Sequence, residues 1–351
     1  MHIAIDVSPL ETGHKRRGTG VYIKNLIEAL EQYESRHSYS FFTRKQKVFN
    51  NADIVHYPYF DPFLSTLPIN KAKPTVVTVH DLIPLIFPDQ FPKGLRGNII
   101  WQIQKTSLAH VQRIITDSKC SQKDIIKIIG YDIDRIDVIP LAPRDTYRPV
   151  KEQRLLASVR KKYRIPETFF LYVGDVNWNK NISSLLKAYS VFIHDNSAHP
   201  WALVLAGEAF NNNTLSEIKE IQRQFDVLQI QPSVIIPGYV SDTELCALYS
   251  QAICLIHPSR YEGFGLPVLE AMACGCPVVT SSASSLSEIA GPALRFNPES
   301  INEILAYLRE ITHQTKEKRS KMINDGYTWV SHFTWRKVAK YTVQSYEKAL
   351  R

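Results

Sequence analysis

The stretch from His257 to Pro277, HPSRYEGFGLPVLEAMACGCP, constrains the fold more than any other part of the chain. The apolar run Ile253–Ile256 before it is typical of a buried strand. Gly263 and Gly265 allow positive φ in the loop that follows, and a proline suits the first turn of a helix. We therefore expect a strand, a glycine loop and a helix over Pro267–Cys274, ended by the next glycine.

The start of this helix predicts an anion site. The amides of Gly265 to Val268 would point, unpaired, out of the helix N-terminus, which attracts negative charge. Glu262 lies in the loop and Glu270 in the first turn or so of the helix, so the two carboxylates can flank one ligand. Because a carboxylate repels phosphate, Glu270 suits a ribose diol and Glu262 a second polyol. The alternative is that Glu270 only supports the helix dipole and Glu262 is a solvated acid.

The wording P-S-x-x-E-G-F-G-L-P-x-L-E-A-M-A-x-G-x-P-V-V resembles the E-x7-E signature of family 4 retaining nucleotide-sugar glycosyltransferases. That resemblance implies the α/β GT-B fold, in which two Rossmann-like domains with doubly wound parallel sheets face each other across a cleft. It also implies that Glu262 contacts the donor sugar as a catalytic residue and that Glu270 holds the nucleotide ribose. The residues that would present backbone to the donor are Gly263, Phe264, Gly265 and Leu266.

A turn earlier in the second half, G-D-V-N-W-N-K-N, is similar to the family's Y-V-G…R-K-N turn. The resemblance implies that Lys180 grips the donor phosphates. Asn179 stands where the family usually has arginine, so Lys180 would be the only strong cation of the clamp unless Arg260 enters the site. An exposed loop lysine is the alternative for Lys180.

The segment G-Y-V-S-D resembles a family segment that lies along the nucleobase. The resemblance implies that Tyr239 and Val240 contact the donor. Independently of that role, Ser241 or Asp242 is expected to cap the helix that follows.

In the first half, K-R-R-G-T-G follows the expected strand His2–Val7 and leads into a helix from about Val21. A glycine loop between a strand and a helix can cradle phosphate. The resemblance implies that Gly18 and Gly20 lie near the donor pyrophosphate or the acceptor. Lys15–Arg17 could meet the acceptor, with a solvated charge run as the alternative.

The β-branched run Thr75–Val79 predicts another strand, followed by H-D-L-I-P. V-H-D-L-I-P resembles a family segment whose histidine touches the transferred sugar, which implies a catalytic role for His80. A purely structural histidine is the alternative. Asp81 could be a general base by position, and it suits a cap of the next turn equally well.

Strands alternate with helices along the chain, which predicts parallel sheets with ligands at the carboxyl ends of the strands. A chain of 351 residues is too long for one ordinary core, so we expect two domains. We place an acceptor-side domain at 1–165 and a nucleotide-sugar-binding domain at 166–330. A final helix within 331–351 is expected to cross back to the first domain.

The basic charge is concentrated in the first half: residues 1–165 hold 26 Lys and Arg against 16 Asp and Glu, whereas the remainder holds 16 against 18. A basic half predicts an anionic partner, unless it is merely a solvated surface. No basic helix or aromatic-basic sheet motif favours nucleic acid. We expect a glycan or lipid-linked acceptor, with peripheral contact at the inner membrane face.

No leader peptide or membrane span is recognisable, so we expect a cytoplasmic protein. The five cysteines are odd in number and form no C-x-x-C, so we interpret them as small buried apolar residues. No D-x-D metal pair accompanies these motifs. The expected reaction therefore uses neither metal nor cofactor, with a nucleotide diphosphate sugar as co-substrate.

Together these features predict a retaining, metal-independent transferase of a hexose. Mannose is the expected sugar, by resemblance to bacterial polysaccharide mannosyltransferases. An epimerase or hydrolase of the same fold is one rival, and a non-catalytic nucleotide or polyanion binder is another, suggested by the missing arginine. A Rossmann dehydrogenase fits poorly, because no G-x-G-x-x-G with a following acid comes after the first strand.

Overall fold

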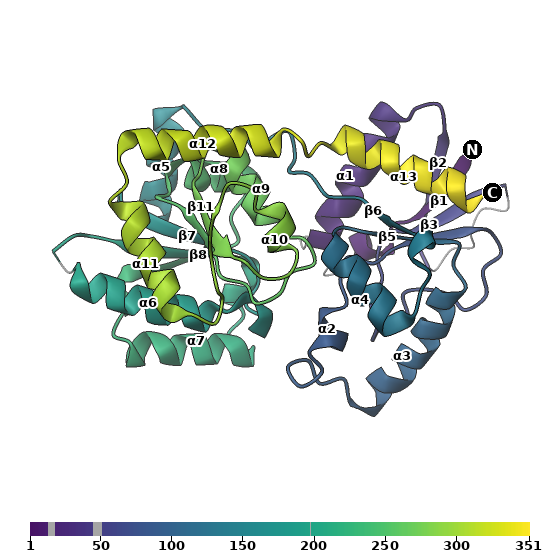
Figure 1. The fold of residues 1–351 in the computed structure, drawn as a ribbon, viewed down its shortest axis with the longest axis horizontal. Coiled ribbons are helices and arrows are strands. Elements are labelled where there is room, and N and C mark those ends of the chain that lie inside the picture. Colours follow the sequence, from purple (N-terminus) through teal and green to yellow (C-terminus); the bar gives the residue numbers. More distant parts are fainter. Residues whose placement is uncertain (13–17, 45–50, 197) are drawn as a thin grey trace. The chain divides into compact units, whose positions relative to one another are not determined.

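The computed structural model describes residues 1–12, 18–44, 51–196 and 198–351. Its contacts divide the chain into two compact units: unit 1 combines Met1–Ala142 with Phe333–Arg351, and unit 2 is Pro143–His332. Each unit has its own six-stranded parallel sheet with helices around it (Figure 1). The predicted α/β class with parallel sheets is confirmed.

The sheet of unit 1 has the order β2-β1-β3-β4-β5-β6. Neighbouring strands are parallel, with Ile3 opposite both Tyr39 and Ile54. The strands are β1 His2–Asp6, β2 Ser38–Phe42, β3 Ile54–Tyr57, β4 Thr75–Thr78, β5 Arg113–Thr116 and β6 Ile136–Val138. The four residues of β3, of β4 and of β5 are all buried, as expected for a sheet covered on both faces.

The α-helices of unit 1 lie around this sheet, and the last helix of the chain is one of them. They are α1 Gly18–Tyr33, α2 Ile83–Ile86, α3 Gly94–Ala109, α4 Lys119–Ile129 and α13 Trp335–Ala349. Helix α13 packs along α1, and its Tyr346 hydroxyl lies 2.8 Å from Nδ1 of the buried His56 on β3. Lys348 adds an ion pair of 2.7 Å with Asp137 of β6. The end of the chain is thus held to unit 1 by both a core contact and a surface pair.

One local prediction for unit 1 is wrong. Helix α1 begins at Gly18, so Gly18 and Gly20 lie in its first turn rather than in a loop before Val21. Glycine is tolerated at the start of a helix as well as in a loop, so the sequence did not separate the two. Helix α4 is capped by Ser118, whose Oγ accepts from the amide of Ser121, and Ser121 itself lies inside the helix. Lys15–Arg17 lie outside the described residues.

The sheet of unit 2 has the order β12-β11-β10-β7-β8-β9, again parallel. The strands are β7 Phe169–Val173, β8 Ala202–Ala206, β9 Val234–Gly238, β10 Leu255–His257, β11 Val278–Ser281 and β12 Leu294–Phe296. The helices are α5 Gln153–Tyr163, α6 Ile182–Asp195, α7 Ser216–Val227, α8 Asp242–Gln251, α9 Leu266–Ala273, α10 Leu286–Ile289, α11 Ile301–Thr312 and α12 Lys316–Val330.

Residues 143–165 belong to unit 2, whereas the sequence analysis divided the chain near 165. The reason is that α5 packs on α8. Gln251 Nε2 donates to the Leu156 carbonyl at 3.3 Å, and the Tyr163 hydroxyl donates to Glu244 at 3.2 Å.

The strand order of unit 2 reverses between β7 and β10. β8 and β9 follow on one side of β7, while β10, β11 and β12 lie on the other, and Leu171 of β7 pairs with Leu255 of β10. Ligands of doubly wound sheets bind outside the carboxyl ends of the strands at such a reversal. The Lys180 turn follows β7 and the glycine-rich stretch follows β10, so both lie at this position.

Candidate active site

Helix α9 begins and ends close to the predicted residues, at Leu266 and Ala273. Gly265 is the N-cap residue, with a φ of +100°. A Cβ placed on Gly265 would lie 2.6 Å from Cδ2 of Leu286. Both the backbone conformation and the lack of space therefore require glycine at the entrance to α9.

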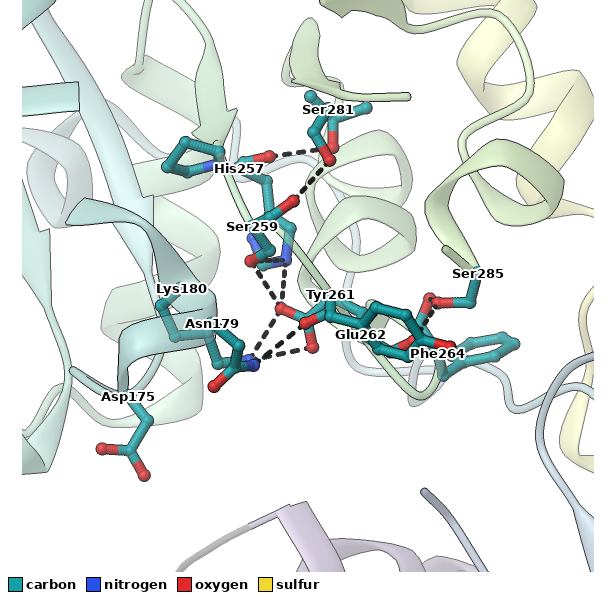
Figure 2. Close-up of polar contacts among 12 residues, drawn as sticks. Asp175, Asn179, Lys180, His257, Ser259, Tyr261, Glu262, Phe264, Ser281 and Ser285 are labelled. Atoms are coloured by element: carbon teal, nitrogen blue, oxygen red, sulfur yellow. Dashed lines mark hydrogen bonds and ion pairs between the residues drawn. The ribbon is translucent and has the colours of Figure 1, made fainter. Parts of the chain in front are cut away.

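Side chains from neighbouring segments hold the loop before α9 at several points (Figure 2). Asn179 donates through its side-chain Nδ2 to the Tyr261 carbonyl at 2.9 Å, and its backbone carbonyl accepts from the Arg260 amide at 2.7 Å. Ser285 Oγ lies 2.9 Å from the carbonyls of both Glu262 and Phe264. These bonds fix the loop before any ligand arrives, which is what a precise site requires.

The Glu262 carboxylate is buried and accepts from three side chains (Figure 2). Lys180 Nζ lies 2.7 and 2.9 Å from its two oxygens. Ser259 Oγ donates at 2.6 Å, and His257 Nε2 lies 2.9 Å away. Burial alone would raise the pKa of Glu262, but Lys180 and His257 outweigh it and hold the pKa well below its usual range. Glu262 is therefore ionised at neutral pH.

His257 and Ser259 were not predicted as site residues. The hydrogen of the His257 ring is assigned to Nε2, because the carboxylate it faces can only accept. The ring is almost fully buried and stacks on Tyr172, with centroids 6.5 Å apart and an interplanar angle of 12°. Both residues lie in the segment 257–259, which opens the motif. The sequence predicts this segment only as the end of a strand.

The sequence leaves open that Arg260 enters the phosphate clamp beside Lys180, but its side chain makes other contacts in this structure. Its guanidinium pairs with Glu299 at 2.8 Å and lies over the Trp178 ring, 5.2 Å from the centroid. Asn179, which stands in the usual arginine position, is buried and serves the loop backbone. Lys180 is thus the cation that this structure places against Glu262, whereas Arg260 pairs with Glu299. A contact of Arg260 with a donor stays a prediction.

Glu270 has different surroundings, although it lies on the same motif. Its carboxylate accepts from the Tyr249 hydroxyl of α8 at 3.3 Å. The nearby Arg144 guanidinium pairs with the Asp242 carboxylate. Asp242 also accepts from the Tyr147 hydroxyl at 3.3 Å. Burial raises the pKa of Glu270 from 4.5 to about 7, although Tyr249 and Arg144 both act to lower it. Glu270 can therefore gain or lose a proton near neutral pH.

The N-terminus of α9 offers fewer amides than predicted. The Val268 amide donates to the Gly265 carbonyl at 3.0 Å, and Pro267 has no amide hydrogen. The prediction of an open row from Gly265 to Val268 is wrong for these two positions, because the first turn closes with an i to i−3 bond. Leu266 and Gly265 remain as the donors at this end. The predicted contacts of Gly263, Phe264, Gly265 and Leu266 with a donor stay predictions.

Tyr239 and Val240 follow β9 and precede α8, and Tyr239 is exposed. Ser241 caps α8, with its hydroxyl accepting from the Glu244 amide, and the Glu244 carboxylate completes a capping box. The cap predicted for Ser241 is confirmed. A contact of Tyr239 and Val240 with a nucleobase stays a prediction.

In unit 1, His80 follows β4, and its Nδ1 lies 2.7 Å from Oδ2 of Asp117. Burial lowers the pKa of His80, but Asp117 more than offsets this and raises it above its ordinary value. The Tyr22 ring meets the imidazole edge-on at 4.6 Å. Asp81 accepts from the Ile83 amide at 3.0 Å, as a cap of that turn. The catalytic role of His80 and the donor roles of Gly18 and Gly20 stay predictions.

Within the described ranges, no three His, Cys, Asp or Glu side chains form a group that could hold a metal ion. No helix among the described residues is both long enough and apolar enough to cross a membrane. The prediction of buried cysteines is confirmed for four of the five, and Cys120 is partly exposed.

Two family models match the chain. Residues 157–329 match the model described as Glycosyl transferases group 1, and residues 13–142 match Glycosyltransferase Family 4. O-antigen chain mannosyltransferase B of Escherichia coli is 30% identical over 280 residues, which cover 79% of this chain and 71% of that protein. The serotype-specific mannosyltransferase WbdA of Escherichia coli is 25% identical over 280 residues, 79% of this chain but only 34% of WbdA.

Solved structures share the fold. Sucrose-phosphate synthase from Thermosynechococcus elongatus matches with a TM-score of 0.76 and 19% identity, covering 99% of this chain and 98% of that chain. HepE from Anabaena in complex with UDP-glucose matches with a TM-score of 0.73 and 16% identity, covering 99% of each chain. The two parallel-sheet units therefore form a GT-B fold. The chain belongs to the glycosyltransferases, as the family models and its Escherichia coli mannosyltransferase relative show.

Proposed function

We propose that this glycosyltransferase is a retaining mannosyltransferase that uses a nucleotide diphosphate sugar. One observation carries the proposal: Lys180 and Glu262, 82 residues apart, meet at the carboxyl ends of β7 and β10. An ammonium suits a diphosphate and a carboxylate suits sugar hydroxyls, and the resemblance assigns those two roles to these two residues. The names of the relatives support mannose, and the UDP-glucose held by HepE supports a nucleotide-sugar donor.

The geometry suggests how binding and transfer are linked. Without a donor, the Lys180 ammonium neutralises Glu262. A donor diphosphate would compete for that ammonium, while His257 and Ser259 would keep Glu262 aligned toward the sugar. The leaving diphosphate would be stabilised by Lys180 and by the N-terminus of α9.

The proposed reaction also requires a base for the proton of the acceptor hydroxyl, and a particular kind of acceptor. The departing phosphate oxygen would take the proton of the acceptor hydroxyl, so that attack on the same face retains the anomeric configuration. Glu270 would hold the ribose, and the proposal needs neither a metal nor another cofactor. The acceptor is proposed to be a glycan or a lipid-linked glycan at the inner membrane face, because the first half of the chain is basic.

The test is to incubate the purified chain with a panel of nucleotide sugars, with and without an acceptor glycan. We expect nucleoside diphosphate release that depends on the acceptor, and a product whose anomeric configuration matches the donor by NMR. Release without acceptor would indicate a hydrolase, and an altered sugar that stays on its nucleotide an epimerase. Donor binding without turnover would indicate a binding protein. An inverted anomer would overturn the retaining assignment.

A further inference from the structure

Helix α3 of unit 1, Gly94–Ala109, carries apolar side chains on two opposite faces. Trp101 and Leu108 face the core and are buried. Leu95, Ile99 and Ile103 are 84%, 63% and 40% exposed, and their four-residue spacing places them on one stripe. A surface helix of a globular protein normally has a single apolar face, with polar residues on the other. The outer stripe of α3 is therefore an unusual surface for a water-exposed helix.

A second segment of the chain packs against α3 and also carries exposed apolar side chains. Residues 63–71 are held against α3 by Gln104, whose Nε2 donates to the Leu67 carbonyl at 3.0 Å and whose Oε1 accepts from the Thr66 amide at 3.0 Å. This segment carries two more exposed aliphatic side chains, Leu64 and Ile69, and Ile69 lines a hollow together with Thr106 and His110 at the end of α3. We call these five side chains the α3 patch: Leu64, Ile69, Leu95, Ile99 and Ile103. Figure 1 shows α3 at the edge of unit 1.

The charges around the α3 patch are mostly positive. Helix α3 contains Arg96 and Lys105 and no acidic residue, and residues 61–113 hold six Lys and Arg against three Asp. At its C-terminal end a hollow of about 580 Å³ is lined by Lys71, Lys73 and His110 among others. Lys71 is engaged by Ser107, whose carbonyl and hydroxyl lie 2.7 and 2.9 Å from its Nζ. An apolar stripe with cations beside it complements a surface that is negatively charged outside and apolar beneath.

We propose that the α3 patch docks the protein onto an anionic lipid surface. The five aliphatic side chains would enter the boundary between headgroups and acyl chains, while Arg96, Lys105 and Lys73 would meet lipid phosphates. This identifies the surface behind the peripheral membrane contact of the proposed function. The inference rests on that part of the proposal alone, and its test involves no sugar transfer.

The experiment is flotation of the full chain with vesicles of phosphatidylglycerol and phosphatidylcholine, compared with phosphatidylcholine alone. We expect binding to the anionic vesicles that weakens at high salt, and little binding to the neutral ones. The triple change Leu95→Ser, Ile99→Ser and Ile103→Ser should reduce binding about tenfold or more. Arg96→Gln and Lys105→Gln should each reduce it about fivefold. Leu95, Arg96, Ile99 and Ile103 are exposed and Lys105 is partly exposed, so circular dichroism and thermal unfolding should stay unchanged.

The matched control is Val227→Ser at the end of α7, where the valine is 71% exposed but lies on unit 2. It should bind vesicles as the wild type does. Equal binding by the triple variant, or no binding by the wild type, would overturn the proposal. So would a wild-type dimer that the triple variant abolishes, because the patch would then join two copies. Donor turnover with an acceptor free in solution tests the proposed function separately.

Discussion

Glu262 and Glu270 belong to one motif, yet their surroundings shift the pKa values of the two carboxylates in opposite directions. Glu262 is held by Lys180, His257 and Ser259, and its pKa lies well below the usual range. Glu270 is partly buried and accepts from the Tyr249 hydroxyl, and its pKa rises to about 7. The comparison teaches that the number of donors around a buried carboxylate, rather than the motif that contains it, decides its charge.

The largest effect is expected for Glu262→Gln. The change removes the charge that Lys180 and His257 align, at a residue proposed to contact the sugar in the transition state. We expect kcat to fall about 100- to 1000-fold, in the range for losing one aligned electrostatic contact. The measurement is acceptor-dependent release of nucleoside diphosphate over a range of donor concentrations. Glu299→Gln changes a nearby exposed glutamate and should leave kcat unaltered; an unaltered kcat in the Glu262 variant would remove its catalytic assignment.

Glu270→Gln should alter how stability depends on pH. Folding raises the pKa of Glu270 from 4.5 to about 7, so the folded state binds this proton more tightly than the unfolded state. The wild type therefore loses stability as pH rises through that window, and glutamine does not titrate. Relative to the wild type, the variant should gain about 3 kcal/mol in the free energy of unfolding across the window.

Urea unfolding at pH 5 and at pH 8 measures this difference. Glu244→Gln is the control, because the pKa of Glu244 is lowered to about 2 and its carboxylate stays ionised at both values. The wild-type and Glu244→Gln curves should shift together between the two pH values. A Glu270→Gln variant that also shifts with the wild type would show that Glu270 is ionised throughout.

Lys180→Met should mainly weaken donor binding. It removes the cation proposed to meet the diphosphate, worth about 2 kcal/mol for a charged hydrogen bond, or about 30-fold in the donor Kd. Titration calorimetry with the nucleoside diphosphate measures this, and Lys187→Met on α6 is the exposed control. Combining the change with Glu262→Gln gives a double-mutant cycle. Additive effects would indicate that Lys180 and Glu262 act independently, contrary to their contact.

Ser259→Ala should have the smallest effect. Ser259 donates one of several hydrogen bonds to Glu262, and Lys180 and His257 remain after its loss. We expect about 1 kcal/mol, or a fivefold lower kcat with little change in KM. The exposed Ser158→Ala on α5 is the control. A loss as large as that of Glu262→Gln would mean that Ser259 has a role of its own in the reaction.

The sequence was informative where a single residue type dictates the backbone. Gly265 and Pro267 placed the start of α9 within a residue, and Ser241 was recognised as a cap because a hydroxyl there meets the first free amides. The parallel α/β class followed from the alternation of strands and helices along the chain. These are local rules, and they held because tertiary packing did not oppose them.

The sequence was uninformative where a residue's role depends on distant partners. His257 and Ser259 contact the Glu262 carboxylate because the loop folds back toward β10. Lys180 reaches the same carboxylate from the turn after β7. Arg260 could not be assigned either, because its choice between a ligand and Glu299 depends on where Glu299 lies, 39 residues away. Gly18 and Gly20 were misplaced because glycine suits both a loop and a helical turn.

The restricted space at Gly265, where α9 begins, limits which positions of this protein can be varied in engineering. Any side chain at Gly265 would collide with Leu286, and the loop before it is tied to Asn179 and Ser285. Substitutions at Gly265 should therefore strain the backbone, displace Leu286 and lower the free energy of unfolding. Diversity is better introduced at the exposed Tyr239, where a change leaves that scaffold intact.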